Sequence, residues 1–228
     1  MTQKKVETKI QPEGRSVREN VRAAAVHLFA EYGYHAAPLR NIARMAGIQA
    51  ASIYYHYANK EALLVEIMET YMQQLNASLE SILHEQTDPR QRLYDAIANH
   101  IRLHTSYKAE FFIIDTEIRA LEGDNRRYIL SLRDRYEFLL QEILRDGMES
   151  GVFRQSDVKV SSYAIIAMCT EVATWFRPNG RLSVQQVIDL YSQMITRGLL
   201  VVTPDPCDTT GKRNEQHLMY DKREQPQS

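Results

Sequence analysis

Residues 38–57 have the sequence PLRNIARMAGIQAASIYYHY, which is the pattern of two short helices joined by a tight turn. Small or apolar residues recur three and four positions apart on each side of Gly47, as one face of a helix requires. Glycine adopts a positive φ without a Cβ clash, so Gly47 suits the turn. The stretch therefore predicts a helix-turn-helix, with buried faces formed by Ile42, Ala43, Ala46, Ala50, Ile53 and Tyr54.

Helical segments flank this motif on both sides. Ser16 and Glu19 have the spacing of a capping box, and the apolar pattern that follows predicts a helix over residues 17–32, ended by Gly33. Asn59 is a suitable N-cap for another helix, whose apolar period continues for about 20 residues. The three helices before Asn59 form a small unit, and the long helix connects it to a second domain.

The rest of the chain keeps a helical period and contains no convincing strand pattern. Further helices are predicted from Leu93 to about Tyr107, over 110–121, from Ile129 to Gly147 or Gly151, and over 158–176 and 184–200. We expect an all-α fold with a helix-turn-helix domain at residues 15–75 and a second helical domain at 76–203. Residues 1–14 are predicted to form a flexible arm, and residues 204–228 a disordered tail.

Composition places the chain among ordinary globular proteins. Of its 228 residues, 44% are hydrophobic and 25% are charged. No apolar run reaches the roughly 20 residues that a membrane helix needs, and the N-terminus lacks the apolar core of a secretory signal. Cys169 and Cys207 suggest neither a disulfide framework nor a metal motif. We expect a cytoplasmic protein that has no membrane partner and needs no cofactor.

The charge is distributed unevenly along the chain. The formal net charge is −1, but residues 15–60 hold six Lys or Arg and two acidic residues, a local charge of +4 that leaves −5 for the rest. A basic segment in a mildly acidic protein is typical of one nucleic-acid-binding end. The alternative at this point is chance clustering of charges.

Two interpretations of residues 38–57 remain open from spacing alone. The first is a helical hairpin that only packs, and the second is a DNA reader whose second helix enters the major groove. In the second interpretation, small or hydrogen-bonding side chains reach base edges, and hydroxyl, imidazole and ammonium groups contact phosphates. The base-contact candidates are Gln49, Ala50 and Ser52, and the phosphate candidates are Tyr55, His56 and Lys60.

Five short segments strengthen the second interpretation by resemblance: Gly33-Tyr34, Leu39–Ala43, Ala46–Ile48, Ser52–Tyr57 and Asn59–Leu63. Together they resemble the N-terminal domain of TetR/AcrR transcriptional regulators. The resemblance implies a three-helix DNA-binding domain, a helical ligand-binding and dimerisation domain, and a homodimer on a palindromic operator of double-stranded DNA. It also implies repression that a small molecule relieves. The DNA-contacting positions carried over are Arg40, Ser52, Tyr54, Tyr55, His56 and Lys60, although the family mostly packs a core tyrosine where Tyr54 stands.

The motif departs from the family pattern in three places. Ala37-Pro38 replaces a hydroxyl residue that caps the first helix of the motif, and Pro38 is expected at the first helical position. Loss of such a cap costs about 1 kcal/mol. Ala51 replaces a frequent glycine and restricts the approach of the backbone to DNA. Gln49 replaces Ser or Thr, so it is expected to change the bases that are read.

The second half of the chain carries no nucleophile motif, HExxH, P-loop or GxGxxG. Acidic residues crowd residues 115–124, and His100 and His104 are four apart, but neither group has the spacing of a metal site, and no metal is expected. An all-α enzyme is nevertheless a second hypothesis, and an architectural DNA binder without sequence preference is a third.

A ligand cavity is predicted near residues 111–114, which offer more apolar surface than one helix face can bury. The alternative is that these residues form core or dimer interface. The segment 175–183 resembles the C-terminal domains of TetR-family regulators of fatty-acid and steroid-ring catabolism. That resemblance implies an acyl-CoA effector, whose phosphates would meet Arg119, Arg177 or Arg181; a non-CoA hydrophobic ligand or drug is the alternative. The candidate ligand-binding residues are Phe111, Phe112, Asp115, Arg119, Met168, Val172, Trp175 and Arg177.

The last two helices predict the dimer. The segment 158–176 has no polar face, and the segment 184–200 has a wide apolar stripe. Two such helices from each subunit form a four-helix interface around a two-fold axis.

Overall fold

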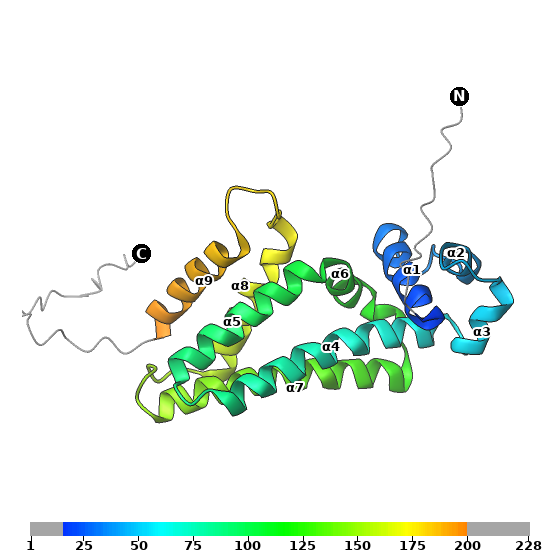
Figure 1. Ribbon diagram of the computed structural model, residues 1–228. Coiled ribbons are helices and arrows are strands. Elements are labelled where there is room, and N and C mark those ends of the chain that lie inside the picture. Colours follow the sequence, from blue (N-terminus) through cyan, green and yellow to red (C-terminus); the bar gives the residue numbers. More distant parts are fainter. Residues whose placement is uncertain (1–15, 200–228) are drawn as a thin grey trace, which may run out of the picture.

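The computed structural model describes residues 16–199, which form helices joined by short turns (Figure 1). The predicted all-α fold is confirmed. The predicted arm at residues 1–14 and tail at 204–228 lie outside the described residues. The helices are α1 (Val17–Tyr32), α2 (Leu39–Met45), η1 (Ala50–Ser52), α3 (Ile53–His56), α4 (Lys60–Glu85), α5 (Pro89–Ser106), α6 (Lys108–Glu117), η2 (Ile118–Ala120), α7 (Gly123–Glu149), α8 (Val158–Trp175) and α9 (Val184–Leu199).

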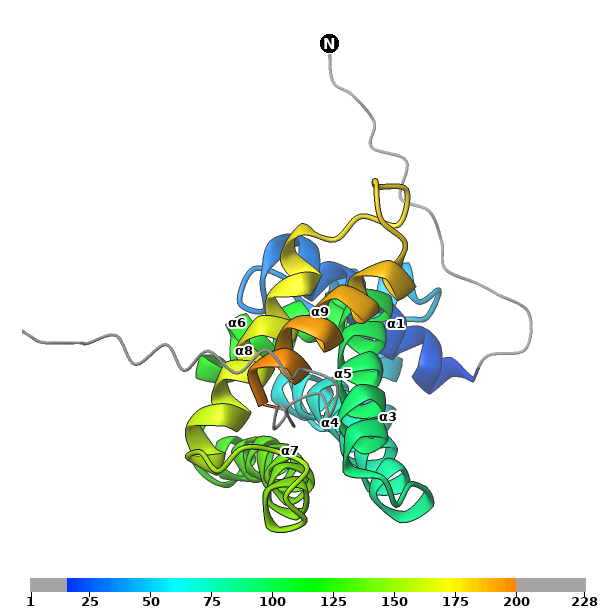
Figure 2. The ribbon, with the colours of Figure 1, turned by 90° about the vertical axis from the view of Figure 1, so that its left-hand side faces the viewer.

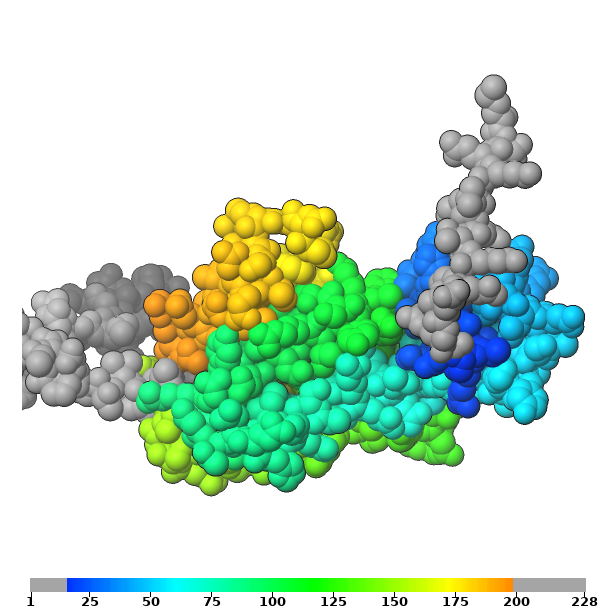
Figure 3. All heavy atoms as spheres, in the orientation of Figure 1, coloured from blue at the N-terminus to red at the C-terminus, as the bar shows by residue number. Residues whose placement is uncertain are grey.

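A small lobe made of α1, α2, η1 and α3 lies at one end of the molecule (Figures 1 and 3). α1 begins at a capping box in which the Ser16 hydroxyl accepts from the Glu19 N–H and the Glu19 carboxylate accepts from the Ser16 N–H. It ends at Gly33, whose φ is 83°. Both predicted ends of this helix are confirmed.

α4 connects the small lobe to the rest of the molecule. Asn59 caps its start by accepting from the Ala62 N–H at 2.8 Å, as predicted. The helix continues for 26 residues, which is about 39 Å. The predicted domain boundary at residues 75/76 falls inside this helix, and one continuous cluster of buried side chains runs through both halves of the chain.

The larger lobe is a bundle in which α4 and α7 lie side by side (Figure 1). Hydrogen bonds link Glu61 to Asn125, and Glu80 to Arg135, so the two helices run in the same direction. α5 packs against α4, α7, α8 and α9. α8 and α9 lie at the end of the molecule opposite the small lobe (Figure 2). α5 is therefore the central helix of the larger lobe, with other helices packed on both of its sides.

The end of α7 agrees with the second of its two predicted stops, Gly151, whereas its start was predicted too late. The helix begins at Gly123, six residues before Ile129, and it passes through Gly147 to end at Glu149, with Ser150 as C-cap and Gly151 at φ = 72°. Gly147 lies inside the helix because the Phe153 ring packs on it: an added Cβ would lie 2.0 Å from Phe153 Cδ2. This glycine therefore provides room for a returning aromatic ring rather than a helix stop.

Candidate functional site

A glycine turn follows α2 in the small lobe. The Ile48 N–H donates to the Ala43 carbonyl at 3.0 Å. The Gly47 N–H donates to the Arg44 carbonyl at 3.2 Å, and the two bonds together form a Schellman motif. Gly47 has φ = 76°, the left-handed backbone that glycine adopts without strain. The predicted turn is confirmed.

The start of α2 differs by one residue from the prediction. Pro38 occupies the N-cap position and Leu39 is the first helical residue. No side chain caps this helix, so the predicted loss of the cap is confirmed.

The second part of the motif, η1 and α3, buries a different face from the one predicted. Ile53 and Tyr57 are buried, whereas Ala50 and Tyr54 are exposed, Tyr54 by 61%. Ile53 and Tyr57 are four residues apart and share one face, while Tyr54 is turned roughly 100° away from it. Tyr57, not Tyr54, is therefore the core tyrosine.

A polar network fixes the end of α3 against its neighbours. The Tyr57 hydroxyl donates to Glu66 Oε1 of α4 at 2.9 Å, and Arg18 Nε of α1 donates to Glu66 Oε2 at 2.9 Å. The Arg18 guanidinium also lies over the Tyr57 ring, 5.2 Å from its centroid. Burial and the bond to Glu66 raise the pKa of Tyr57, so its hydroxyl stays protonated and keeps donating. Three elements are thereby held in one arrangement.

Most predicted DNA-contacting side chains are exposed on this lobe. Tyr55 is 89% exposed, and His56 is half-buried. Exposed with Tyr55 are Arg40, Gln49, Ala50 and Ser52. α2 and α3 form the end of the molecule most distant from α9 (Figures 1 and 3), so a DNA duplex can approach them without meeting the larger lobe. The DNA contacts themselves stay a prediction.

Lys60 differs from the other candidates because the lobe itself already binds its amine. The ammonium donates to the Tyr34 carbonyl and, at 3.4 Å, to the His35 carbonyl. It also lies 4.4 Å from the centroid of the Tyr34 ring. Partial burial lowers the pKa of Lys60, and the charge of Glu117 opposes that shift. Lys60 thus holds the turn after α1 in place.

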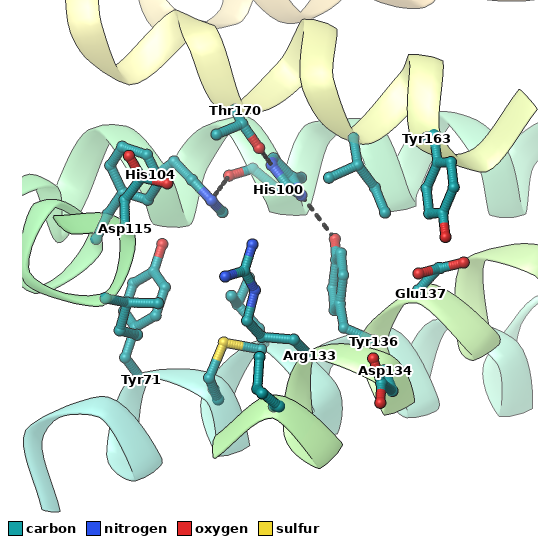
Figure 4. A pocket seen from close by; sticks show the side chains of 16 residues that line it. Tyr71, His100, His104, Asp115, Arg133, Asp134, Tyr136, Glu137, Tyr163 and Thr170 are labelled. Carbon is teal, nitrogen blue, oxygen red and sulfur yellow. Dashed lines mark hydrogen bonds between the residues drawn. The ribbon is translucent and has the colours of Figure 1, made fainter. Parts of the chain in front are cut away.

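A cavity of about 420 Å³ lies between α4, α5, α6, α7 and α8 (Figure 4). Its volume is in the range of small-molecule pockets. Apolar side chains line much of it, among them Met72, Leu75, Phe111, Ile114, Leu130 and Ile166. Its polar lining includes Tyr71, His104, Asp115, Arg133, Asp134 and Glu137. Such a surface accepts a mainly apolar ligand that carries a few polar groups.

The structure separates the eight predicted ligand residues. Phe111 and Asp115 line the cavity. Phe112, Arg119, Met168 and Val172 do not line it: Val172 is core, and the other three are exposed. Trp175 and Arg177 line a separate hollow of about 260 Å³ with Phe176, Gly180, Arg181 and Leu182. The cavity thus excludes Phe112, Arg119, Met168 and Val172. A segment rich in apolar residues does not reveal which side of its helix faces the cavity.

Sequence reasoning missed most of the polar lining, including Tyr71, Arg133 and Tyr136. These residues lie on α4 and α7, which the sequence treats as regular amphipathic helices. Their signal was weak: each is a polar or aromatic residue close to the apolar face of a long helix. Only the packing of α6 and α8 over that face makes them neighbours.

His100 and His104 form a buried stacked pair in the cavity wall, with ring centroids 3.9 Å apart. His100 Nδ1 lies 2.8 Å from the Tyr136 hydroxyl, and its Nε2 lies 3.0 Å from Thr170 Oγ1 (Figure 4). Burial lowers the pKa of both imidazoles, that of His104 to about 4, so both are neutral at pH 7. Within residues 16–199, no three His, Cys, Asp or Glu side chains are arranged as metal ligands.

α6 contacts both the cavity and the small lobe. Phe111, Ile114 and Asp115 project from it into the cavity. Two residues further on, Glu117 Oε1 accepts a hydrogen bond from the Tyr34 N–H at 3.1 Å. α6 also packs directly against α1. A change in cavity occupancy therefore has a short physical route to the helix-turn-helix.

Both α8 and α9, which lie toward the viewer in Figure 2, expose large apolar side chains. The sequence predicts that α8 has no polar face and joins a dimer interface, and in the single subunit much of the helix is exposed, including Val160 and Met168. An exposed apolar surface on two adjacent helices is typical of a protein interface. The large exposed side chains are Val160, Tyr163, Met168, Trp175, Leu190 and Met194.

These features define a class of protein: a helical DNA-binding regulator with a helix-turn-helix lobe and a cavity-containing lobe. Residues 21–67 match the bacterial regulatory proteins of the tetR family, and residues 86–199 match the tetracyclin repressor-like C-terminal domain. The chain belongs to the TetR family of transcriptional regulators. Among residues 16–199, no helix has the length and apolar character to span a membrane.

Individual relatives refine this assignment. The transcriptional repressor KstR2 of Mycobacterium tuberculosis is 30% identical over 187 residues, which covers 81% of this chain and 93% of the relative. The regulator PfmR from Thermus thermophilus superposes with a TM-score of 0.73 at 34% identity, covering 78% of this chain and 97% of PfmR. AibR, in complex with isovaleryl coenzyme A and operator DNA, superposes with a TM-score of 0.72 at 27% identity over 78% and 97% of the two chains.

Proposed function

We propose that the chain is a homodimeric repressor that binds a palindromic operator and leaves it when a small molecule enters the cavity. The observation that carries the proposal is that α6 contacts both the cavity and the exposed helix-turn-helix lobe. We also infer that it acts in the cytoplasm and is not an enzyme, as expected for a transcriptional regulator.

The second part of the motif would enter the major groove. Gln49, Ala50 and Ser52 begin that segment and are exposed, so we assign them to base edges. Tyr55, His56 and Arg40 are assigned to phosphates. Lys60 belongs with them only if its amine reaches DNA while it holds the Tyr34 carbonyl.

An acyl-CoA thioester is the effector that we favour. AibR was solved with isovaleryl coenzyme A, and the apolar lining of the cavity here suits an acyl group. Asp115, Asp134 and Glu137 line the cavity, so the CoA phosphates would lie outside it. Lys108, Arg177 and Arg181 are candidates for those phosphates, since Lys108 and Arg177 both bond the Thr174 carbonyl and Arg181 shares a hollow with Arg177.

Selection of bound genomic fragments followed by competition with random DNA tests the DNA part. We expect one palindromic site to be enriched and to resist competition. On that site, Gln49→Ala should reduce the discrimination between bases at one position by about 1–3 kcal/mol. His56→Ala should instead lower the affinity for specific and random DNA alike. Equal losses on both DNAs for Gln49→Ala would remove Gln49 from the base-reading set.

A thermal-shift panel of acyl-CoA thioesters, with the matching free acids and hydrophobic drugs, tests the effector part. We expect a thioester to raise the melting temperature and to release the protein from the selected DNA. Response to a drug or free acid, but to no thioester, would support the non-CoA alternative.

A further inference from the structure

One buried hydroxyl in the cavity wall has no protein partner. Tyr71 is 4% exposed, and its hydroxyl forms no hydrogen bond within residues 16–199. Its ring meets the His104 and Tyr107 rings edge-on, with centroids 5.7 and 6.5 Å away, so packing holds the side chain in place. A buried hydroxyl without a partner destabilises a fold. The space beside it is the cavity, into which the hydroxyl points (Figure 4).

An arginine without a partner projects into the same space. The Arg133 guanidinium of α7 lies between Tyr71 and Tyr136 in the cavity (Figure 4) and forms no ion pair or hydrogen bond within the described chain. Arg135, two residues further along α7, instead pairs with Glu80 at 2.9 Å on the outer surface. A guanidinium and a phenol are both donors, so together they suit an oxygen acceptor.

The imidazole opposite them is an acceptor. His104 Nδ1 lies 3.0 Å from the His100 carbonyl, which only accepts, so Nδ1 carries the proton of the neutral ring. His104 Nε2 is then free to accept from a hydroxyl group. Both nitrogens of His100 are occupied by Tyr136 and Thr170, so His100 supports the wall rather than the ligand.

The charge of the lining argues against an anionic group at this point. Asp115, Asp134 and Glu137 outnumber Arg133 in the wall. A carboxylate brought into the cavity would add a negative charge to a lining that already holds three, which disfavours it. A neutral carbonyl accepts from Arg133 and Tyr71 without that repulsion.

We propose that the part of the effector that enters the cavity carries an uncharged carbonyl oxygen in addition to any thioester carbonyl, bound by the Arg133 guanidinium and the Tyr71 hydroxyl. A hydroxyl on the same group would donate to His104 Nε2. The remaining apolar wall holds the carbon skeleton, so oxo-acyl groups are preferred over plain alkyl chains and over dicarboxylic acyl groups. This inference rests on the proposed function, because it takes the cavity as the effector site.

Matched thioesters test it on the full-length protein. Dissociation constants are measured for valeryl-CoA, 4-oxovaleryl-CoA and glutaryl-CoA, and for cyclohexanecarbonyl-CoA with its 4-oxo derivative. We expect each oxo thioester to bind about tenfold or more tightly than its plain counterpart, since a plain acyl chain leaves the buried Tyr71 hydroxyl unpaired. Glutaryl-CoA should not exceed 4-oxovaleryl-CoA.

Two variants and one control assign the effect to residues. Arg133→Met and Tyr71→Phe should each reduce the oxo preference to about threefold or less, whereas Arg135→Met, on the outer surface of the same helix, should keep it. Tyr71→Phe should also raise the melting temperature of the ligand-free protein, because it removes an unpaired buried hydroxyl. A lower melting temperature for Tyr71→Phe would instead indicate that the hydroxyl stabilises the ligand-free protein.

The outcomes separate this inference from the proposed function. Equal affinity for oxo and plain thioesters, or tightest binding by glutaryl-CoA, overturns the carbonyl assignment and leaves an acyl-CoA effector in place. Binding of none of the five thioesters overturns the acyl-CoA effector and the carbonyl assignment with it.

Discussion

Burial decides the charge of the two histidines in the cavity wall. His100 and His104 are each 5% exposed, and their pKa values are lowered because the charged ring would lose its hydration. The structure compensates both neutral rings with hydrogen bonds to Tyr136, Thr170 and a backbone carbonyl. On its α5 side the cavity is therefore lined by uncharged imidazoles that form hydrogen bonds. Histidine side chains in water often titrate near pH 7, and burial prevents this here.

This burial predicts a loss of stability in mild acid. Because the folded pKa of His104 is depressed, the unfolded chain binds more protons below its own pKa near 6.5, and the free energy of unfolding falls as the pH drops towards 4. Between pH 7 and 5 His104 should contribute a loss of about 2 kcal/mol, and His100 a loss in the same direction. Urea unfolding across this range measures it. His104→Phe should make the dependence shallower, while His84→Gln, at an exposed histidine, should leave it unchanged.

At the scale of elements, α6 is the shortest link between the two lobes. Cavity residues lie on one part of this ten-residue helix, and Glu117 at its end accepts from the Tyr34 N–H. Glu117 Oε1 would also lie 3.4 Å from a Cβ added at Gly33, so helix and turn are in close contact. Lys60 holds the same turn from its other side through the Tyr34 carbonyl. A displacement of α6 therefore acts on the turn that precedes α2.

Glu117→Ala should weaken communication between the lobes without removing either activity. The variant should keep the melting-temperature shift caused by the effector and its affinity for the operator. The reduction of operator affinity by the effector should shrink about fivefold or more, which is within the usual size of coupling between sites. Operator titrations with and without the effector measure this ratio, and Asp115 is not a suitable control because it lines the cavity. Glu122→Ala, at the exposed N-cap of α7, is the control. Unchanged coupling in Glu117→Ala would exclude this contact as the route.

At the scale of the whole molecule, the two ends differ in surface chemistry. The helix-turn-helix lobe exposes polar and aromatic side chains, and the opposite end exposes an apolar face on α8 and α9. A two-fold axis through the apolar face would make a dimer that carries two helix-turn-helix lobes, the number that a palindromic operator requires. Such an interface would cover the exposed apolar side chains of α8 together with Leu190 and Met194, whereas Val187, Ile188 and Ile195 of the α9 stripe are already buried within one subunit.

Met194→Asp should therefore dissociate the dimer. Placing an unpaired charge in an apolar interface should raise the dimer dissociation constant by about 30-fold or more. Analytical ultracentrifugation measures the mass at micromolar concentration, and operator affinity should fall with it. Val17→Asp, at an exposed apolar residue of the other lobe, should keep the dimer mass. A dimer that survives Met194→Asp would assign the interface to another surface.

Local patterns were sufficient for much of the fold. The capping box at Ser16, the N-cap at Asn59 and the turn at Gly47 involve groups within a few residues of one another, so their hydrogen bonds follow from spacing. The helix-turn-helix and the family resemblance lie within the same short range. Of the two predicted stops for α7, Gly151 agrees with the structure and Gly147 does not, because Gly147 makes room for the Phe153 ring, a packing contact that local spacing does not show.

The sequence by itself determined the all-α class and the helix-turn-helix over residues 38–57, because these depend on periodicity and local chemistry, and five short segments gave the resemblance to the TetR family. Only the tertiary structure decided that Tyr57 rather than Tyr54 is buried, and that Tyr71, His104 and Arg133 share one cavity. Those three side chains come from α4, α5 and α7, up to 62 residues apart in the chain. Their proximity depends on how the helices pack, which no spacing in the sequence records.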